Sequence, residues 1–393
     1  MSGEGDEMDL ESILFESGAS LDDLDDKKEH TGKKIDYIVR YVEQWIIVGC
    51  ASPDIKSLCF IDGMSNAGIY QDGELGTASR VYRAFCNAAK DNSGMRFSLI
   101  FNDHNVQRIA VLESVCNNIR KNDVSGRQLT NLELYVSSRD VNDFIASLKQ
   151  HEGLISGRGN LTLLFIDPYN ARTVDVVALR GFMKSHYCEL FFNWFSSDHV
   201  RNKDDGAIRH CFEGIDIPPG RDASDFIADY LAPENAMHFS YPFKTRTNSE
   251  LYQIIFVTPH IRGLEKLKDA LWDTFDGQEY HRNTPSGKLD QISIFDLDET
   301  HEWQNEERKR EYGKFAQDIV LQEFSGRTVA FDEIEQIVLQ RSMLKSSDVI
   351  RCVITPLINV KLITKLNMGV ARQNYKKDHY RIGGSEYGTL QSN

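Results

Sequence analysis

Two alternating patterns of apolar residues run through residues 33–196. In KKIDYIVRYVEQWIIVG, apolar residues recur every three or four positions, as on one face of a helix: Ile35, Ile38, Val39, Val42 and Trp45. The segment SLCFIDGM that follows has a short, unbroken apolar run typical of a buried strand. Further strand-like runs, separated by helical patterns, are FSLIFNDHN, LELYVSS, LTLLFIDPYN and CELFFNWF. This alternation predicts an α/β fold with a doubly wound, mostly parallel sheet covered by helices on both faces.

The pattern changes twice after residue 196. Residues 198–245 are more polar and irregular, and we expect an insertion there that carries the helix ASDFIADYLA. LYQIIFVTPH and RGLEKLKDALWDTF then add a strand and a helix, so residues 31–290 are expected to form one domain. Residues 305–385 contain three apolar-faced helices and a basic extended piece, ARQNYKKDHYRIGG, which favours a winged-helix-like domain. A small helical packing domain is the alternative.

Charge is distributed unevenly along the chain. The net charge is −14, and residues 1–30 contribute −9 of it, from eleven Asp and Glu against Lys27 and Lys28. This composition predicts a disordered acidic tail, which either binds a protein partner or keeps the chain in solution. Residues 341–393 carry nine Lys and Arg against three acidic residues. A nucleic-acid contact is therefore expected at this basic end, through Lys376, Lys377 and Arg381; a plain solvated hairpin is the alternative.

The seven cysteines lie far apart, without a CxxC pair, and several sit inside apolar runs. They are expected to be buried, reduced thiols of a cytoplasmic protein. No stretch approaches the roughly 18 apolar residues of a membrane span. The eleven histidines show no paired-ligand spacing, so no metal is expected.

Carboxylates follow four of the predicted strands in succession: Asp62, Asp103, Asp140 and Asp167. Because parallel strands end at one edge of a sheet, these groups are expected to surround a ligand site. The turn after the first strand, DGMSNAG, has small residues at Gly63, Ala67 and Gly68 but matches neither GxGxxG nor GxxxxGK[ST]. A cofactor without phosphates suits such a turn, and S-adenosylmethionine is the common one. The expected cofactor-binding residues are Asp62, Gly63, Ala67, Gly68, Asp103 and Asp140; an ordinary strand-to-helix corner is the alternative.

The sequence Asp167-Pro168-Tyr169 points to chemistry on an amine. A carboxylate and a neighbouring backbone carbonyl can accept the two hydrogens of an exocyclic amine, and an aromatic ring can stack on the base. Asp167, Pro168 and Tyr169 supply these parts as expected catalytic residues, and Asn193, at the end of the next strand, is an expected substrate contact. The alternative for Asp167 and Pro168 is an ordinary turn at the end of a strand. The alternative for Asn193 is a buried amide whose hydrogen bonds are satisfied within the protein.

Four blocks over about residues 33–275 resemble the three-Cys-motif partner proteins (TcmP), a bacterial family with a class I methyltransferase-like fold. The blocks are KKIDYIVRYVEQW, FIDGMSNAGIYQDG, LLFIDPYN, and LFFNWF with LYQIIFVTPHIRGLEKLKDALWD. They are similar in order and spacing to the family's lysine- and tryptophan-flanked helix, F-A-G-P-G-x-Y turn, F-I-D-P-F-G motif and T-x-H strand–helix. Met64-Ser65-Asn66 stands in the family's turn core, and Tyr169-Asn170 replaces its F-G. The resemblance implies a Rossmann-like methyltransferase fold, S-adenosylmethionine as cofactor and a setting near antiviral defence genes.

A sister group, the ribosomal-RNA adenine methyltransferases, is similar at the same places. Asp62, Ala67, Gly68 and Tyr70 match its Y-L-D-x-x-A-G-x-G-R-Y motif. Asp167, Pro168 and Tyr169 match its D-P-P-Y motif, one proline short.

Three functions remain open from the sequence. The first is an S-adenosylmethionine-dependent methyltransferase acting on a nucleic-acid amino group. The second is a catalytically inactive methyltransferase-fold protein that serves as an interaction scaffold in a defence or regulatory assembly. The third, which the absence of a close acidic cluster disfavours, is a nuclease with Mg²⁺ held by Asp140 and Asp167.

Overall fold

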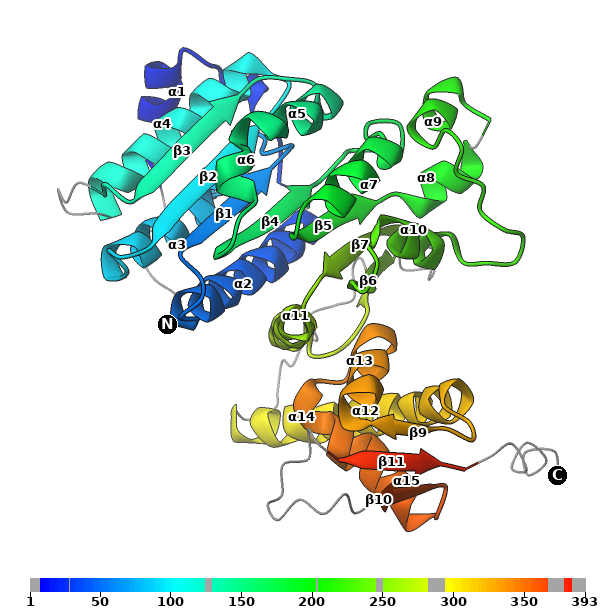
Figure 1. Ribbon diagram of the computed structural model, residues 1–393. Coiled ribbons are helices and arrows are strands. Elements are labelled where there is room, and N and C mark those ends of the chain that lie inside the picture. Colours follow the sequence, from blue (N-terminus) through cyan, green and yellow to red (C-terminus); the bar gives the residue numbers. More distant parts are fainter. Residues whose placement is uncertain are drawn as a thin grey trace. The chain divides into compact units, whose positions relative to one another are not determined.

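The computed structural model describes residues 8–27, 29–123, 129–202, 204–244, 250–281, 294–366 and 378–383 (Figure 1). The chain divides into two units, Met1–Pro259 with Glu279–Asn283, and His260–Gln278 with Thr284–Asn393. Helix α11 (Ile261–Phe275), which the sequence assigns to the first domain, belongs to the second unit.

An eight-stranded sheet forms the centre of the first unit, in the order β3-β2-β1-β4-β5-β7-β6-β8. Strands β1 to β5 run parallel, and β7 runs antiparallel to both of its neighbours, β5 and β6. The sheet is therefore mostly parallel, as predicted. The strands are β1 (Ser57–Asp62), β2 (Arg96–Asn102), β3 (Leu132–Ser137), β4 (Asn160–Ile166), β5 (Glu189–Trp194), β6 (Met237–Lys244), β7 (Glu250–Thr258) and β8 (Tyr280–His281).

Helices cover both faces of this sheet, because its central strands are apolar on both sides (Figure 1). On one face α2 (Glu29–Ala51) packs beside α3 (Thr77–Asp91), and α3 beside α4 (Val106–Asp123). The predicted apolar face of α2 is buried, which confirms its periodicity. The other face carries α5 (Val141–Ser147), η2 (Leu148–His151), α6 (Glu152–Ile155), α7 (Val176–Ser185) and α10 (Ala223–Leu231).

Glu189 is a buried acid in the core under α2. It is 4% exposed, and its two carboxylate oxygens accept hydrogen bonds from Tyr41 Oη at 2.6 Å and Thr258 Oγ1 at 2.7 Å. Burial raises the pKa of Glu189 to about 7, although these hydrogen bonds act in the opposite direction.

The acidic N-terminal segment is folded over residues 8–27, contrary to the predicted disorder. It forms α1 (Leu10–Ser17) and the 3₁₀ turn η1 (Leu21–Asp23), and α1 packs on α4. Ile13 and Leu24 are 0% and 3% exposed, so two apolar side chains anchor an otherwise charged stretch. The remaining residues of the predicted tail, 1–7 and 28, lie outside the described residues.

The insertion predicted at 198–245 is shorter in the structure. It contains α8 (Ser196–Arg201), α9 (Gly206–Cys211) and α10, whereas residues 237–244 form β6 of the central sheet. The alternating burial of β6, seen in MHFSYPFK, is the period-two pattern of a strand.

The second unit contains α11, α12 (Ile294–Glu323), β9 (Thr328–Ala330) and α13 (Phe331–Arg341), followed by a continuous helical segment. That segment consists of α14 (Ser346–Val349), a π-helical turn (Ile350–Ile354) and α15 (Thr355–Asn359). Strands β10 (Ile363–Leu366) and β11 (His379–Ile382) join β9 in a three-stranded antiparallel sheet, in the order β10-β11-β9. The three predicted helices are therefore present, around a core that includes Val320, Ile334, Val353 and Tyr380.

All seven cysteines are free thiols, and all but the half-buried Cys50 are buried, as predicted. Within the described parts of the chain, no helix has the length and apolar character needed to cross a membrane.

Candidate active site

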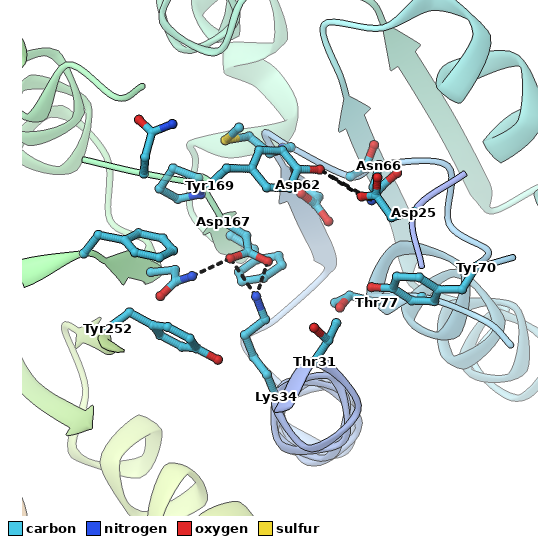
Figure 2. Close-up of a pocket in the computed structure, with 18 of the residues that line it drawn as sticks. Asp25, Thr31, Lys34, Asp62, Asn66, Tyr70, Thr77, Asp167, Tyr169 and Tyr252 are labelled. Atoms are coloured by element: carbon cyan, nitrogen blue, oxygen red, sulfur yellow. Dashed lines mark hydrogen bonds and ion pairs between the residues drawn. The ribbon is translucent and has the colours of Figure 1, made fainter. Parts of the chain in front are cut away.

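A cleft of about 840 Å³ lies beyond the carboxyl ends of β1, β4 and β5. β1 has β2 on one side and β4 on the other, so the cleft lies at the switch point where doubly wound folds bind ligands. Its volume falls in the range of roughly 300–1,000 Å³ found for small-molecule and cofactor sites. The lining residues come from the N-terminal segment, the start of α2, the turn after β1, the start of α3, the segment after β4, α8 and β7 (Figure 2).

Asp167, which follows β4, is held by two donors inside the cleft (Figure 2). Lys34 Nζ, on the first turns of α2, lies 2.9 Å from Oδ1 and 2.6 Å from Oδ2. Asn193 Nδ2, on β5, donates to Oδ1 at 2.8 Å. The predicted residues Asp167 and Asn193 thus meet in a charge-assisted network with Lys34. Pro168 lines the same cleft.

The side-chain oxygen of Asn193 is left without a partner. Asn193 is 2% exposed and lines the cleft, and its Oδ1 accepts no hydrogen bond within the described structure. The orientation of the amide is fixed, because only Nδ2 can face the carboxylate of Asp167. An unpaired buried acceptor costs about 1–3 kcal/mol, and this oxygen lies beneath the cleft surface with almost no exposed area of its own.

Asp62, the last residue of β1, is a buried acid on the wall of this cleft. It is 1% exposed, and its Oδ1 accepts a hydrogen bond from Met64 N at 3.0 Å. Burial raises the pKa of Asp62 well above its usual value, and the carboxylates of Asp167 and Asp103 raise it further. The Met64 N–H and the Lys34 ammonium act in the opposite direction. Burial and the two neighbouring carboxylates thus favour the neutral form of Asp62 more than in an exposed aspartate.

The small residues of the turn after β1 serve mainly to pack the turn. A Cβ on Gly63 would lie 2.5 Å from Ile166 Cδ1, and one on Gly68 would lie 2.3 Å from Ser79 Oγ. Gly68 also has φ +70°, in the left-handed region that favours glycine. Gly68 lines the cleft, whereas Gly63 and Ala67 are not among its lining residues. Close packing against Ile166 and Ser79 therefore explains why this turn needs glycine at positions 63 and 68.

Asn66 occupies the position where the resembled family has a turn glycine. Its φ of +57° is left-handed, a conformation that asparagine tolerates better than most residues. The side chain adds bonds that glycine could not make: Nδ2 donates to Asp25 Oδ2 at 2.5 Å, and Oδ1 accepts from Ala67 N at 2.6 Å. Asparagine at position 66 thus keeps the left-handed backbone conformation, and its side chain also forms a hydrogen bond with Asp25 of the N-terminal segment.

Asp103 and Asp140, both predicted to face a cofactor, are not among the lining residues of the cleft. Asp103 is 2% exposed, and its oxygens accept hydrogen bonds from Asn105 N at 2.9 Å and Asn66 N at 3.2 Å. Asp140 is exposed and caps the N-terminus of α5 by accepting from Asn142 N at 2.8 Å. Both acids thus stabilise loops around the site.

Tyr169 extends from the segment after β4 to the turn after β1 (Figure 2). Its hydroxyl donates to Asp25 Oδ2 at 3.3 Å and accepts from Arg108 Nη1 at 3.1 Å. Burial is the largest cause that raises the pKa of the Tyr169 phenol, and the charge of the Asp25 carboxylate is the second. Tyr169 is still 53% exposed, so part of its ring is open to contact with a ligand.

The residues predicted to contact nucleic acid belong to the second unit. Arg381 lies exposed on β11. Lys376 and Lys377 lie outside the described residues. Three other basic side chains of this region are paired: Lys345 with Asp269, Arg351 with Glu306 and Asp348, and Lys365 with Asp378.

Two charged residues of the hydrogen-bond networks in the cleft, Lys34 and Asp25, are not among the predicted site residues. The sequence analysis places Lys34 in the helix KKIDYIVRYVEQW, whose lysine is part of the family resemblance, and gives it no role in the site; a lysine in the first turns of a helix beside a predicted site is the signal that identifies it. The composition of residues 1–30 predicts disorder at Asp25, and the sequence signal for its docking is Leu24, an apolar residue within the acidic run that is buried in the structure.

Comparisons with known proteins give little further information. No protein-family model matches the chain, and no curated protein matches it. Protein LPL1258 of Legionella pneumophila strain Philadelphia 1, assigned to family DUF519, is 10% identical, with a TM-score of 0.35, over 62% of this chain and 93% of that one. A Listeria monocytogenes protein described provisionally as a class I S-adenosylmethionine-dependent methyltransferase is 11% identical, with a TM-score of 0.30, over 59% of this chain and 61% of that one.

At these identities and TM-scores the two similarities support no conclusion about activity. The resemblance to the three-Cys-motif partner family is not tested by them and stays a prediction.

Proposed function

We propose that this protein is an S-adenosylmethionine-dependent methyltransferase that modifies an amino group of a nucleic-acid base. The observation that carries the proposal is the Asp167 carboxylate inside the cleft, which Lys34 and Asn193 hold and beside which Pro168 also lines the cleft. An amine that donates one hydrogen to this carboxylate and one to the neighbouring Pro168 carbonyl would have its lone pair held in one direction. Lys34 and Asn193 fix Asp167 in place before a ligand arrives.

The cleft has room for a nucleoside-sized cofactor as well as part of an acceptor. Asp62, Lys34, Met64 and Asn66 line it and would hold the cofactor, which supplies an electrophilic methyl group when bound. On methyl transfer the amine nitrogen would become positively charged, and the electron pair of the broken carbon–sulfur bond would leave with the cofactor. Asp167 is the group placed to stabilise that charge and to accept the proton that the nitrogen releases.

The nucleic-acid part of the proposal rests on Tyr169 and on the second unit. The half-exposed Tyr169 ring can stack on a base, a contact that every base can make. The order of α12, β9, α13, the 346–359 helical segment, β10 and β11 supports a winged-helix-like module. Exposed Arg381 would contact phosphates there, together with the predicted Lys376 and Lys377. A defence role rests on the family resemblance alone.

The test is a methyl-transfer assay with the full chain, S-adenosylmethionine labelled in its methyl group, and single-stranded DNA, duplex DNA and total RNA. We expect label in at least one nucleic acid, and a loss of at least about 100-fold in Asp167→Ala, because a positioned acid–base group contributes about 10²–10⁴-fold. Asp204→Asn, at a carboxylate whose side chain is 82% exposed, is the control and should keep the full rate. Label in none of the three nucleic acids, or an unchanged rate in Asp167→Ala, would refute the proposal.

A scaffold without catalysis is the second candidate. The finding that favours it is that Asp103 and Asp140 do not line the cleft. A scaffold function predicts that the Asp167→Ala variant still binds its partner and that the wild type methylates no substrate. The nuclease alternative loses support from the same finding, because Asp140 caps α5 outside the cleft that Asp167 lines.

A further inference from the structure

The segment from Leu21 to Lys27 is fastened to the turn that follows β1. Gln71 Nε2 donates to Leu24 O at 2.9 Å and to Leu21 O at 3.3 Å, and Gln71 N donates to Asp25 O at 3.2 Å. Lys27 forms an ion pair with Glu74. Upstream, α1 packs on α4, where Ser114 Oγ donates to Glu16 Oε2 at 3.0 Å. The segment thus has a defined path along the cleft.

Asp25 projects from this segment onto the cleft wall (Figure 2). Its Oδ2 accepts from Asn66 Nδ2 and from the Tyr169 hydroxyl, and its Oδ1 accepts from Arg108 Nη2 at 2.6 Å. Its side chain is 32% exposed. A carboxylate oxygen can accept about two hydrogen bonds, so Oδ1 keeps a position open for a ligand donor.

The donor that suits this position is an uncharged hydroxyl. The Arg108 guanidinium already balances the charge of Asp25, so a second cation would gain little. Asp103, at the end of β2, is where a ribose-binding acid is expected in this class of fold, but it is 2% exposed, hydrogen-bonded to two backbone N–H groups and absent from the cleft wall. Asn66 links the two acids, because its N–H bonds Asp103 and its side chain bonds Asp25.

We propose that Asp25, supplied by the N-terminal segment, is the carboxylate that binds the ribose hydroxyls of the nucleoside cofactor, in place of Asp103. The proposal rests on the proposed function, since it takes a nucleoside cofactor as the ligand. The N-terminal segment is then part of the binding site. Asn66, Arg108 and Tyr169 are positioning residues that hold Asp25 toward the ligand.

The experiment measures binding of S-adenosylmethionine, adenosine and 2′,3′-dideoxyadenosine to the full chain by calorimetry. For Asp25→Ala we expect S-adenosylmethionine to bind about 10- to 100-fold more weakly, the range for losing a hydrogen bond to a charged group. The wild type should prefer adenosine over the dideoxynucleoside by about tenfold or more, and Asp25→Ala should lose most of that preference. Asp22→Asn, an exposed acid of the same segment, is the matched control and should bind like the wild type.

Thermal unfolding and near-ultraviolet circular dichroism show whether Asp25→Ala is folded, and Asp25→Asn serves as a second variant that keeps the size of the side chain. Equal affinity and equal ribose preference in the wild type and both Asp25 variants would overturn this inference and leave the proposed function standing. Tighter binding in the variants would overturn it as well, because the segment would then exclude the ligand. No binding of S-adenosylmethionine or adenosine by the wild type would overturn the proposed function, and this inference with it.

Discussion

The ammonium of Lys34 lies 2.6 Å from Oδ2 of Asp167, and the two side chains are 12% and 21% exposed. Removing one member of such a pair leaves a poorly solvated charge, whereas removing both does not. We therefore expect Lys34→Met to lower the free energy of unfolding by about 1–3 kcal/mol, and Lys34→Met/Asp167→Asn to recover part of that loss. Urea denaturation measures both.

The exposed pair Arg209–Asp204, with side chains 65% and 82% exposed, is the matched control for Lys34 and Asp167. Arg209→Met should change the free energy of unfolding by less than about 1 kcal/mol. Additive effects in the Lys34/Asp167 double-mutant cycle would show that the pair is not energetically coupled, contrary to this account.

Gly68 and Gly73 offer a test of how tightly the turn after β1 is packed. Both have a positive φ, +70° and +81°, but a Cβ on Gly68 would overlap Ser79 and Leu112, whereas one on Gly73 would meet nothing within 4 Å. Gly73→Ala should cost about 1–2 kcal/mol from backbone strain alone. Gly68→Ala should cost about 1–3 kcal/mol more from overpacking, as measured by urea unfolding. Equal costs would mean that Ser79 and Leu112 can move aside.

Asn66 is predicted to have a backbone role and a side-chain role that two substitutions can separate. Asn66→Gly and Asn66→Ala both lose the bond to Asp25, but only alanine is strained at a φ of +57°. We expect Asn66→Ala to be about 1–2 kcal/mol less stable than Asn66→Gly by urea denaturation. Ligand affinity should fall equally in the two variants, since both release Asp25. Equal stability of the two variants would contradict the left-handed conformation of this residue.

Stability should depend on pH through Glu189. Its pKa rises from 4.5 to about 7 on folding, so between these values the folded chain holds a proton that the unfolded chain has released. The free energy of unfolding therefore falls as pH rises from about 4.5 to 7 and levels off above. Between pH 5 and 8 the contribution of Glu189 should fall by on the order of 3 kcal/mol.

Glu189→Gln removes this titration while keeping the side chain's size. Urea unfolding at pH 5 and pH 8 should show the variant gaining stability relative to the wild type at the higher pH. Parallel pH profiles for the two proteins would mean that Glu189 does not titrate differently in the folded and unfolded chains.

The parts of the fold that the sequence predicted are those governed by local periodicity. The apolar face of α2 reflects the burial of one side of that helix. The unbroken apolar runs of β1 and β5 reflect the burial of both faces of the sheet. The meeting of Asp62, Asp167 and Asn193 at one cleft also follows from topology, because parallel strands end at one edge of the sheet.

The parts that were missed depend on partners distant in sequence or on ambiguous residue types. The docking of residues 8–27 requires the surface of α4, which composition cannot reveal. β6 contains Pro242, a residue that argues against a strand inside a sheet. Asp103 and Asp140 were expected to face a ligand, but a short acid after a strand can equally cap the next loop or helix, and the sequence does not separate the two uses.

The central claim is that the cleft beyond β1, β4 and β5 binds S-adenosylmethionine. The most direct measurement is calorimetric titration of the full chain with S-adenosylmethionine, with Asp204→Asn as the control variant. We predict saturable binding at one site per chain, retained by Asp204→Asn and weakened by Asp25→Ala. Absence of saturable binding by the folded wild-type chain would contradict the account.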